Sequence, residues 1–567
     1  MIEMLPPGAI LILGGLLLPL LPNKSARSLF GLVVCGLGMA HLWMLPTDFS
    51  WMVHTFGYEL EVVRLDKLSF LFAFIFHIAA FLSMLFAFHL DDRLQHLAGL
   101  TYAGSAVAAA CAGDLITLFV FWEATAITSV FLIWANNTER AYQTGIRYLM
   151  MQVGSGVLLL AGAITLYEET GVLAFNHIGI ETLGGKLILI GFGIKACFPF
   201  LHNWLQDAYP EATVTGTVWL SAFTTKLAIY ALCRGYAGTE ILIPIGAAMT
   251  AFPIFYAVIE NDLRRVLAYS LNNQLGYMVV GVGIGSELAI NGTVSHAFAH
   301  IIYKGLLFMS MGAVLHRVGT IKGSELGGLF RTMPFTMFFC VIGAMSISAF
   351  PLFSGFVTKS MILTAAAEEH HTVVFLILLF ASAGVFHHSG IKIPYFAFFA
   401  HDSGLRPKEA PWNMLLAMAI AAFLCVAIGV YSAPLYALLP YDMHELHWVA
   451  YDTTHVVTML QLLLSSALAF VFLQKFGLYP PELKSTNLDV EWIYRKALPS
   501  ILTLTYQVAG DAQKTLKSLV GDQIHAGLGT VRRLHQPPGI MGEPWPTGST
   551  AMWAAILLGL YLLAYYI

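Results

Sequence analysis

Apolar residues gather in long runs along almost the whole chain, and short polar turns separate the runs. A helix needs about 20 mostly apolar residues to cross the hydrocarbon core of a bilayer. The pattern therefore predicts an all-α polytopic membrane protein with about 14 to 16 transmembrane helices. The predicted spans lie near residues 8–22, 27–45, 68–89, 94–112, 114–134, 143–167, 186–206, 213–234, 240–259, 264–284, 289–315, 332–350, 411–431, 455–474 and 549–567, with a discontinuous span within 352–400.

One region near the C-terminus departs from this pattern. Residues 475–548 begin with a polar stretch and continue with apolar positions at helical spacing, from Ile501 to Val531. This periodicity predicts an amphipathic helix, which is either an ordinary surface helix or a brace lying along the protein. The proline-rich segment "HQPPGIMGEPWPTGS" then leads into the last span.

The composition strengthens the membrane assignment, because 58% of the 567 residues are hydrophobic and only 11% are charged. Soluble proteins carry about 25% charged residues. No basic segment or small-residue cleavage site accompanies the first apolar run, so we expect it to remain as a helix. The six cysteines occur singly, without the close spacings of zinc, iron–sulfur or haem sites. We therefore expect no cofactor in this chain, and any electron-transfer group belongs to another subunit.

Charged residues alternate between the predicted loops. The loop after the first span holds Lys24 and Arg27, and the loop after the ninth span holds Arg264 and Arg265. The loops after the second and sixth spans are acidic. Because basic loops remain in the cytoplasm, this alternation predicts a multi-pass protein of the inner (cytoplasmic) membrane with its N-terminus outside.

Ionisable residues interrupt several of the predicted spans. A charge at the bilayer centre costs at least about 2.5 to 3.5 kcal/mol on insertion scales, so each one needs a partner or a function. His296, His300 and Lys304 fall near one helical face. Glu123 and Lys195 lie on neighbouring spans and can form a pair. A change in the distance within such a pair loads a proton onto the lysine or releases it. The candidate proton-pathway residues are Glu123, Lys195, Lys226, His296, His300, Lys304 and Lys392.

Several other interpretations have less support. Lys359 fits a lysine near a helix end that reaches the membrane interface, and His387 and His388 fit satisfied core residues. His296 and His300 have the spacing of a helical zinc pair, but an alanine follows the first histidine where a metalloprotease has glutamate. The glycines form no phosphate-binding loop and no G-x-S-x-G turn. We therefore expect no metal site and no catalytic residue.

Two of the lysines precede a proline within a predicted span. Lys195 is followed by Pro199, and Lys392 is followed by Pro394. Proline frees a backbone carbonyl, and broken helices are tolerated at membrane depth where protein or water surrounds them. The repetition predicts two inverted repeats with a broken helix in each. The chain then divides into N-terminal helices (1–90), a first repeat (91–235), a second repeat (236–400), C-terminal helices (401–474), the amphipathic helix with its linker (475–548) and a terminal span (549–567).

Several motifs within residues 60–430 resemble one known family. The motifs are "FWEATAITSVFLI", "GIKACFPFLHNWLQDAYPEATVTGTVWLSAFTTKLAIYALCR", "DLRRVLAYSLNNQLGYM", "SHAFAHIIYKGLLFMSMG" and "FPLFSGFVTKSMI". They resemble the antiporter-like, proton-conducting subunits shared by respiratory complex I, the Mrp-type cation/proton antiporters and membrane-bound hydrogenases. The stretches "PEATVTGTVWLS" and "NNQLGYM" depart from common family patterns and leave the subfamily open.

This resemblance implies a hydrophilic axis of charged residues along the middle of the membrane. Lysine rather than glutamate at 392 resembles the distal complex I subunit and the Mrp D-type subunit. The amphipathic stretch resembles the lateral helix of the distal complex I subunit in its composition. By motif match, the axis would contain Glu123, Lys195, Lys226, His300, Lys304 and Lys392.

The expected function is proton translocation through two half-channels, one per repeat, linked by this axis. In one hypothesis the chain is a subunit of a multisubunit Na+/H+ antiporter, and in a second it is the pump subunit of NADH:quinone oxidoreductase or a membrane-bound hydrogenase. A third is a subunit that energises uptake of inorganic carbon. In each, the chain by itself is no enzyme, and its partners are other membrane subunits, protons and, in an antiporter, Na+ or K+, with no nucleic acid. An enzyme acting on lipid would need a catalytic cluster in a loop, and the sequence shows none.

Overall fold

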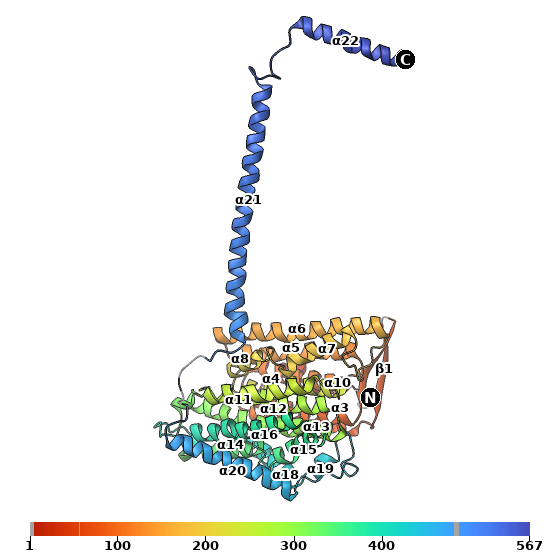
Figure 1. Ribbon diagram of the computed structural model, residues 1–567. Helices are drawn as coiled ribbons and strands as arrows, with labels where there is room; N and C mark the ends of the chain where they lie inside the picture. The colour runs from red at the N-terminus through yellow and green to blue at the C-terminus, as the bar shows by residue number, and fades with distance from the viewer. Residues whose placement is uncertain (1–4, 56, 481–482, 484–486) are drawn as a thin grey trace. The chain divides into compact units, whose positions relative to one another are not determined.

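The computed structural model describes residues 5–55, 57–480, 483 and 487–567. The chain forms two compact units, Met1–Asn487 and Leu488–Ile567. Most of the first unit is helical (Figure 1). Among the described residues, ten helices are long and apolar enough to cross a membrane. The predicted all-α polytopic fold class is confirmed.

The first unit is a series of helices with one β-hairpin between α2 and α3. Its elements are α1 (Ala9–Leu17), η2 (Leu18–Leu20), α2 (Lys24–Met44), β1 (Phe49–Thr55), β2 (Tyr58–Leu65), α3 (Lys67–Phe86), α4 (Arg93–Ala110), α5 (Leu115–Trp134), α6 (Glu139–Thr170), α7 (Leu183–Ala196), α8 (Asn203–Glu211), α9 (Gly216–Ala222), α10 (Thr224–Tyr236), α11 (Leu242–Ile259), α12 (Leu263–Ile284), α13 (Glu287–Val318), η3 (Gly323–Glu325), η4 (Leu329–Arg331), α14 (Pro334–Ile347), α15 (Ser354–Glu368), α16 (Thr372–Val385), η5 (Phe386–Ile391), α17 (Lys392–Pro394), η6 (Tyr395–Phe399), α18 (Trp412–Val430), α19 (Ala433–Tyr436) and α20 (Thr453–Lys475).

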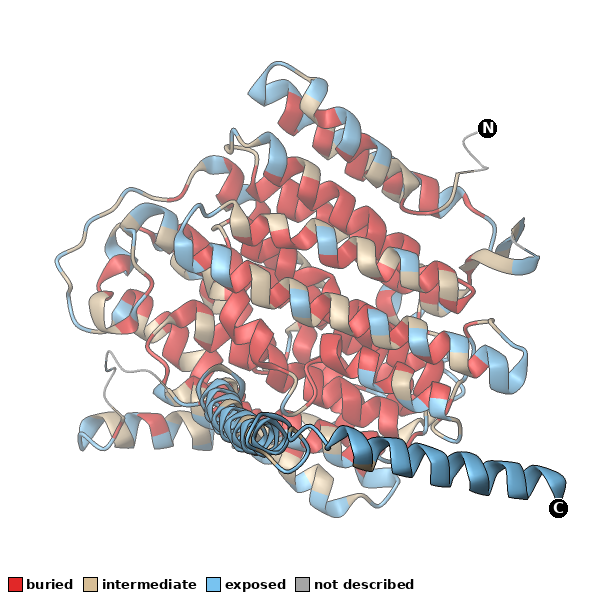
Figure 2. Cartoon of the chain, turned by 90° about the horizontal axis from the view of Figure 1, so that it is seen from above, coloured by how far each residue is buried: buried red, intermediate tan, exposed pale blue. Residues whose placement is uncertain are grey.

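Burial separates the central helices from the peripheral ones. In the most apolar stretch of α13, 94% of the residues are buried, against 39% for α6 and 17% for α20. The outward faces of these two helices carry exposed apolar side chains, such as Val157 and Ile164 on α6 and Leu468 on α20. Figure 2 shows buried residues filling the interior of the first unit. The exposed apolar faces are suited to contact lipid, and α13 is enclosed by protein.

The connections between helices fall into two groups by charge. One group, which we call the basic side, holds Lys24, Arg264, Lys322, Arg331 and Arg406; the other, the acidic side, holds Glu59, Glu168, Glu181, Glu240, Glu368 and Asp442. Hydrogen bonds join connections within each group, as between Asn261 and Ser324 on the basic side and between Asn291 and Tyr441 on the acidic side. This charge separation fits the predicted cytoplasmic location of the basic side.

Two sets of helices, α4–α10 and α11–η6, repeat the same local framework. Asp114 caps α5 and Asp262 caps α12, in each case by accepting hydrogen bonds from backbone amides of the first turn. Each aspartate also forms an isolated antiparallel bridge with a later connection, Asp114 with Ala174 and Asp262 with Lys322. The two bridges have the same sequence separation. Equivalent elements therefore occupy equivalent positions in the two sets.

Each set also contains one interrupted helix. The tetrapeptide "CFPF" separates α7 from α8, and "AFPL" separates α14 from α15. The first and last residues of both tetrapeptides have positive φ angles, 66° at Cys197, 69° at Phe200, 57° at Ala349 and 74° at Leu352. Residues other than glycine seldom adopt this conformation, so its recurrence marks the two breaks as equivalent.

The first set contains an odd number of consecutive helical segments, α4, α5, α6, the α7–α8 pair and the α9–α10 pair. It begins after the α3–α4 connection on the basic side, whereas the second set begins after the α10–α11 connection, which holds Glu240 on the acidic side. The two sets therefore start from opposite sides. The arrangement agrees with the predicted pair of inverted repeats, each containing a broken helix.

The position of the second break differs from the prediction. Pro199 lies in the first break, as expected, but Pro394 lies within a continuous helix over Thr372–Phe399. The segments on both sides of Pro394, η5 and η6, are π-helical. Proline lacks an amide hydrogen, and the wider π turns re-register the backbone hydrogen bonds around it without unwinding the helix. The proline of the second break is Pro351, so Lys392 is not the structural counterpart of Lys195.

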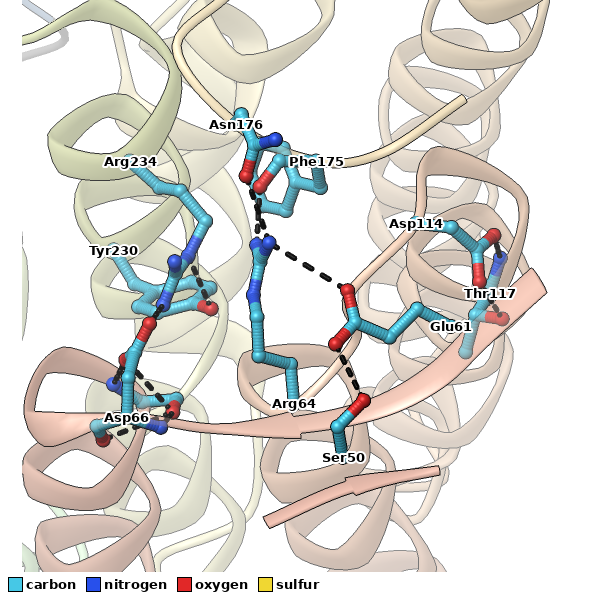
Figure 3. A network of polar contacts seen from close by, with 11 residues as sticks. Ser50, Glu61, Arg64, Asp66, Asp114, Thr117, Phe175, Asn176, Tyr230 and Arg234 are labelled. Carbon is cyan, nitrogen blue, oxygen red and sulfur yellow. Dashed lines mark hydrogen bonds and ion pairs between the residues drawn. The ribbon is translucent and has the colours of Figure 1, made fainter. Parts of the chain in front are cut away.

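The β-hairpin braces the acidic side of the first set of helices (Figure 3). Arg64 on β2 reaches the α6–α7 connection, where it donates to Asn176 Oδ1 at 2.8 Å and to the carbonyl oxygen of Phe175. Asp66, which follows β2, pairs with Arg234 of α10 at 2.8 Å. The hairpin therefore ties α3, α10 and the α6–α7 connection together at one end.

The second unit consists of two long helices and a short turn. The turn η7 (Ile493–Ala497) precedes α21 (Leu498–His535), and α22 (Thr547–Tyr566) follows. The predicted amphipathic helix is present as α21, which is 38 residues long. Its predicted apolar positions are all exposed within this unit, and α22 is apolar enough to cross a membrane.

We expect Asp66→Asn to loosen the hairpin. Partial burial by itself raises the pKa of the Asp66 carboxyl, but the Arg234 guanidinium and hydrogen bonds from Ser69 outweigh it and hold the pKa below its ordinary value of 3.8. The carboxylate therefore stabilises the fold at neutral pH, and this contribution disappears as the pH falls below about 4. The free energy of unfolding should fall by about 1 to 3 kcal/mol at neutral pH, measured by thermal unfolding followed with circular dichroism.

Asp48→Asn is the matched control, because Asp48 is exposed just before the same hairpin. It should unfold like the unmodified protein at neutral pH. Equal stability of the Asp66→Asn and Asp48→Asn variants would contradict the anchoring role of Asp66.

Candidate functional site

The enclosed helix α13 carries a row of protonatable side chains. His296, His300 and Lys304 are each 0% exposed. The rings of His296 and His300 lie 6.2 Å apart. Both ring nitrogens of His300 and the Nζ of Lys304 are buried and have no hydrogen-bond partner among the described residues. Buried polar groups without partners are costly, so these positions favour exchange of protons with water or with one another.

Two lysines of the first set bind backbone carbonyls. Lys195, at the end of α7, donates to the carbonyl oxygen of Trp122 at 2.7 Å and to Thr125 Oγ1 at 3.1 Å. Lys226, at the start of α10, donates to the carbonyl oxygen of Ser221 at 2.5 Å. Ser221 lies in the last turn of α9, where carbonyls lack partners within the helix. Both ammonium groups are thus fully buried and held by the protein.

Glu123 lies beside Lys195 without forming the direct pair that the sequence suggested. Among the described residues no ion pair joins them, because the Lys195 ammonium bonds instead to the carbonyl of the preceding residue, Trp122. The two charges still interact electrostatically. Glu123 is half-buried, its Oε1 has no described hydrogen-bond partner, and it packs against Gly156 of α6. A small movement of the Glu123 side chain would therefore make or break the contact.

His296 connects α13 with two neighbouring helices. Its Nδ1 lies 3.1 Å from Thr358 Oγ1 on α15, and its Nε2 lies 3.1 Å from Gln274 Oε1 on α12. The hydroxyl of Tyr303 lies 3.3 Å from the same Gln274 oxygen. The polar row on α13 thus extends towards α15.

Lys392 ends the row on the basic side. Its ammonium donates to three backbone oxygens at the end of α11, those of Ala257 at 3.2 Å, Val258 at 2.7 Å and Glu260 at 2.6 Å. These carbonyls belong to the last turn and the C-cap of α11, where negative potential favours a cation. Lys392 is therefore directed towards the connection between α11 and α12.

His388 interacts electrostatically with both Lys304 and Lys392. It is 0% exposed, its Nδ1 lies 2.9 Å from Ser389 Oγ, and Ser389 donates to Ser270 Oγ at 2.7 Å. The sequence had favoured a satisfied core histidine here. The Nε2 of His388 has no hydrogen-bond partner among the described residues.

The interpretation of Lys359 as an interfacial lysine was wrong. The side chain is 0% exposed, and its Nζ has no hydrogen-bond partner among the described residues. It lies 4.2 Å from the ring centroid of Tyr277. The break before α15 explains the error, because it begins a new half-length helix in mid-membrane and places Lys359 deep inside. The recurrence of an F-P pair at the second break was the signal in the sequence.

Comparisons with known proteins agree with this arrangement. Residues 112–387 match the family model described as NADH:quinone oxidoreductase/Mrp antiporter, TM. This core of the chain is similar to that family. The part that matches the NADH:quinone oxidoreductase/Mrp antiporter family contains every pathway candidate except Lys392, which lies five residues beyond the matched segment.

Individual relatives come from both branches of the family's description. The chain is 32% identical to the Na(+)/H(+) antiporter D subunit of Alkalihalophilus pseudofirmus, over 45% of this chain and 55% of that protein. It is 34% identical to the NADH-quinone oxidoreductase N subunit of Desulforudis audaxviator, over 44% of this chain and 53% of that protein. The chain thus spans about half the length of these curated relatives. Among solved structures, the Mrp complex from Dietzia sp. DQ12-45-1b contains a chain of similar fold, with a TM-score of 0.76 at 23% identity, covering 93% of this chain and 62% of that chain.

The packing of Glu123 against α6 gives a direct test of the site. A methyl group at Gly156 would lie 1.6 Å from Glu123 Oε1, whereas one at Gly154 on the same helix would meet nothing within 4 Å. We expect Gly156→Ala to displace the carboxylate and to reduce proton flux across the membrane by about tenfold or more. Flux would be followed with a pH-sensitive dye in membrane vesicles. Gly154→Ala is the control and should retain normal flux; similar flux in the two variants would show that the position of Glu123 does not matter.

Proposed function

We propose that this chain is the proton-translocating subunit of a multisubunit Na+/H+ antiporter. The observation that carries the proposal is a row of protonatable side chains that runs through the interior of both sets of helices. Ionisable residues within a membrane are costly and mark proton or ion paths. The members of the row are Glu123, Lys195, Lys226, His296, His300, Lys304 and Lys392.

Proton uptake begins at Lys195. Approach of the Glu123 carboxylate favours the protonated lysine, and separation favours release of the proton. The hydrogen bonds to Trp122 and Thr125 hold the ammonium in one place, so the Glu123 side chain is the element that moves. The half-buried position of Glu123 leaves it room to do so.

Transfer then follows the interior of the first unit. His300 interacts electrostatically with Lys226 and with Lys304, and a neutral imidazole both donates and accepts a proton. From Lys304 the proton passes by way of His388 to Lys392. We place the conducting core in residues 91–235 and 236–400, one half-channel in each.

The Alkalihalophilus relative supports the antiporter assignment, because it is named as part of a Na(+)/H(+) antiporter and shares the core of this chain. Accordingly we propose partners among other membrane subunits of such an assembly, Na+ or K+ as the exchanged cation, and the inner (cytoplasmic) membrane as the location.

A redox complex is the second candidate. The Desulforudis relative, which is named as part of an NADH-quinone oxidoreductase, favours it. In that assembly the same proton path would respond to electron transfer in a partner subunit.

The first test is proton flux in inverted membrane vesicles that contain the chain with its neighbouring subunits. Na+, K+ and NADH are added in turn, and a pH-sensitive dye reports the change. In an antiporter, Na+ or K+ releases the pH gradient, and Lys195→Ala reduces the response by about a hundredfold or more because it removes the first proton carrier.

Lys186→Ala is the matched control, because Lys186 lies on the same helix α7 near the acidic side, away from the axis. A response to NADH alone would assign the chain to a redox complex instead. Near-normal flux in a well-expressed Lys195→Ala variant would disprove the proposed path.

A further inference from the structure

A cavity of about 470 Å³ lies on the outside of the first unit, away from the proposed proton path. It is formed by the β-hairpin, the start of α5 and the acidic-side end of α6. The hairpin stands beside this end of α6 (Figure 1). Small-molecule sites typically have volumes of about 300 to 1,000 Å³. The cavity is therefore large enough to hold part of an organic ligand.

One face of α6 forms the floor of this cavity. Leu160, Ile164 and Glu168 recur at intervals of four residues, so their side chains share that face. Ile164 is 50% exposed, and Leu160 is half-buried. Val157, one turn before Leu160, continues the same face towards the middle of the membrane and is 58% exposed. The floor is thus an apolar strip that ends in a carboxylate on the acidic side.

The hairpin and α5 form the walls. Tyr58 and Leu60 alternate with Glu59 on β2, so both side chains lie on one face of the hairpin, where they line the cavity. Ile116 lines it from the first turn of α5. At the outer end the ring of Tyr58 meets that of Tyr167 edge to face, with centroids 5.5 Å apart. Tyrosines are enriched where the hydrocarbon of a bilayer meets the head groups, so this pair marks that level.

The depth of the cavity matches one leaflet of a bilayer. Helix α6 rises by about 12 Å from Leu160 to Glu168, at about 1.5 Å per residue. The hydrocarbon core of a bilayer is about 30 Å thick, so one leaflet contributes half of that thickness. An acyl chain that lies along α6 would begin near the tyrosine pair and end near Val157. Because Ile164 and Val157 are exposed on the outward face of α6, such a chain can enter sideways from the bilayer.

The charge at the outer end selects the head group. Among the described residues that line the cavity, Glu168 alone is charged, and the next residue, Glu169, is an exposed carboxylate as well. The basic side chain of β2, Arg64, is already bonded to Asn176 and to the carbonyl oxygen of Phe175. Complementary charges favour binding and like charges oppose it. This end of the cavity therefore favours a head group with an ammonium and disfavours one with only negative charge.

We propose that the cavity binds one acyl chain of a phospholipid whose head group carries a primary ammonium, as in phosphatidylethanolamine. The chain lies on α6 between the hairpin and α5, and the ammonium donates to the Glu168 carboxylate. The bound lipid joins the hairpin to α5 and α6 from the outside. The inference goes beyond the proposed function and holds for either kind of complex.

Photocrosslinking identifies the occupant of the cavity. The six native cysteines are all buried, so Ile164→Cys in the assembled complex can be labelled selectively with benzophenone maleimide. The complex is reconstituted in vesicles that contain equal amounts of phosphatidylethanolamine and phosphatidylglycerol with the same acyl chains. After irradiation, mass spectrometry should show phosphatidylethanolamine adducts in excess of phosphatidylglycerol adducts by about threefold or more.

Leu468→Cys is the control, because Leu468 is exposed on the outward face of α20 and far from any carboxylate of this cavity. It should give adducts in the proportions of the vesicle lipids. Equal proportions at positions 164 and 468, or a crosslink from position 164 to another protein subunit, would overturn the proposal.

The role of Glu168 is tested in the same experiment. Glu168→Gln keeps the size of the side chain but removes its charge, so the excess of phosphatidylethanolamine at Ile164→Cys should disappear. Glu169→Gln is the matched control, because the neighbouring side chain points about 100° away around α6 and does not line the cavity. It should keep the excess. An unchanged excess in the Glu168→Gln variant would overturn the assignment of the head group to this carboxylate.

Discussion

The fold depends on the need to satisfy charged groups where no bulk water is available. Three of its interior lysines meet this need by binding backbone carbonyls: Lys195 at Trp122, Lys226 at Ser221, and Lys392 at the end of α11. Carbonyls near helix ends are partial negative charges, so they stabilise an ammonium without requiring a second full charge in the membrane. The acceptors for Lys226 and Lys392 lie at the ends of α9 and α11, whereas the acceptor for Lys195 lies within α5.

The same constraint explains why two sets of helices with one framework differ in chemistry. Both sets have an aspartate cap, a bridge to a later connection and a break with two positive φ residues. In the first set an acidic side chain, Glu123, lies beside the lysine at the break. In the second set the neutral Gln274 and the imidazole of His296 occupy the interior instead. The caps, bridges and breaks place side chains at equivalent positions in the two sets of helices. The residue types at those positions determine which set can respond to a change of charge.

Rigid and adjustable regions are separated accordingly. On the acidic side, one ion pair from Asp66, which follows the hairpin, to Arg234 of α10 and hydrogen bonds from Arg64 to the α6–α7 connection hold the helix ends together. Inside, several polar atoms of the row lack fixed partners among the described residues. Fixed ends with unfixed interior groups suit a path along which protons move while the helices stay in place. Lys304 lies on α13, in whose most apolar stretch 94% of the residues are buried.

The sequence by itself predicted a polytopic helical protein, the amphipathic α21 and the first break at Pro199, because apolar run length and proline position are local properties. The seven candidate residues remain a prediction. The sequence also carried the resemblance that led to the family. It did not determine the second break, since Pro394 fits a π-helical turn and the equivalent proline is Pro351. Only the tertiary structure showed that Lys359 is buried and that Lys392 faces the basic side. Those facts depend on contacts with α11, α12 and α13, which lie far away in the chain, and no local pattern encodes the depth at which separate helices meet.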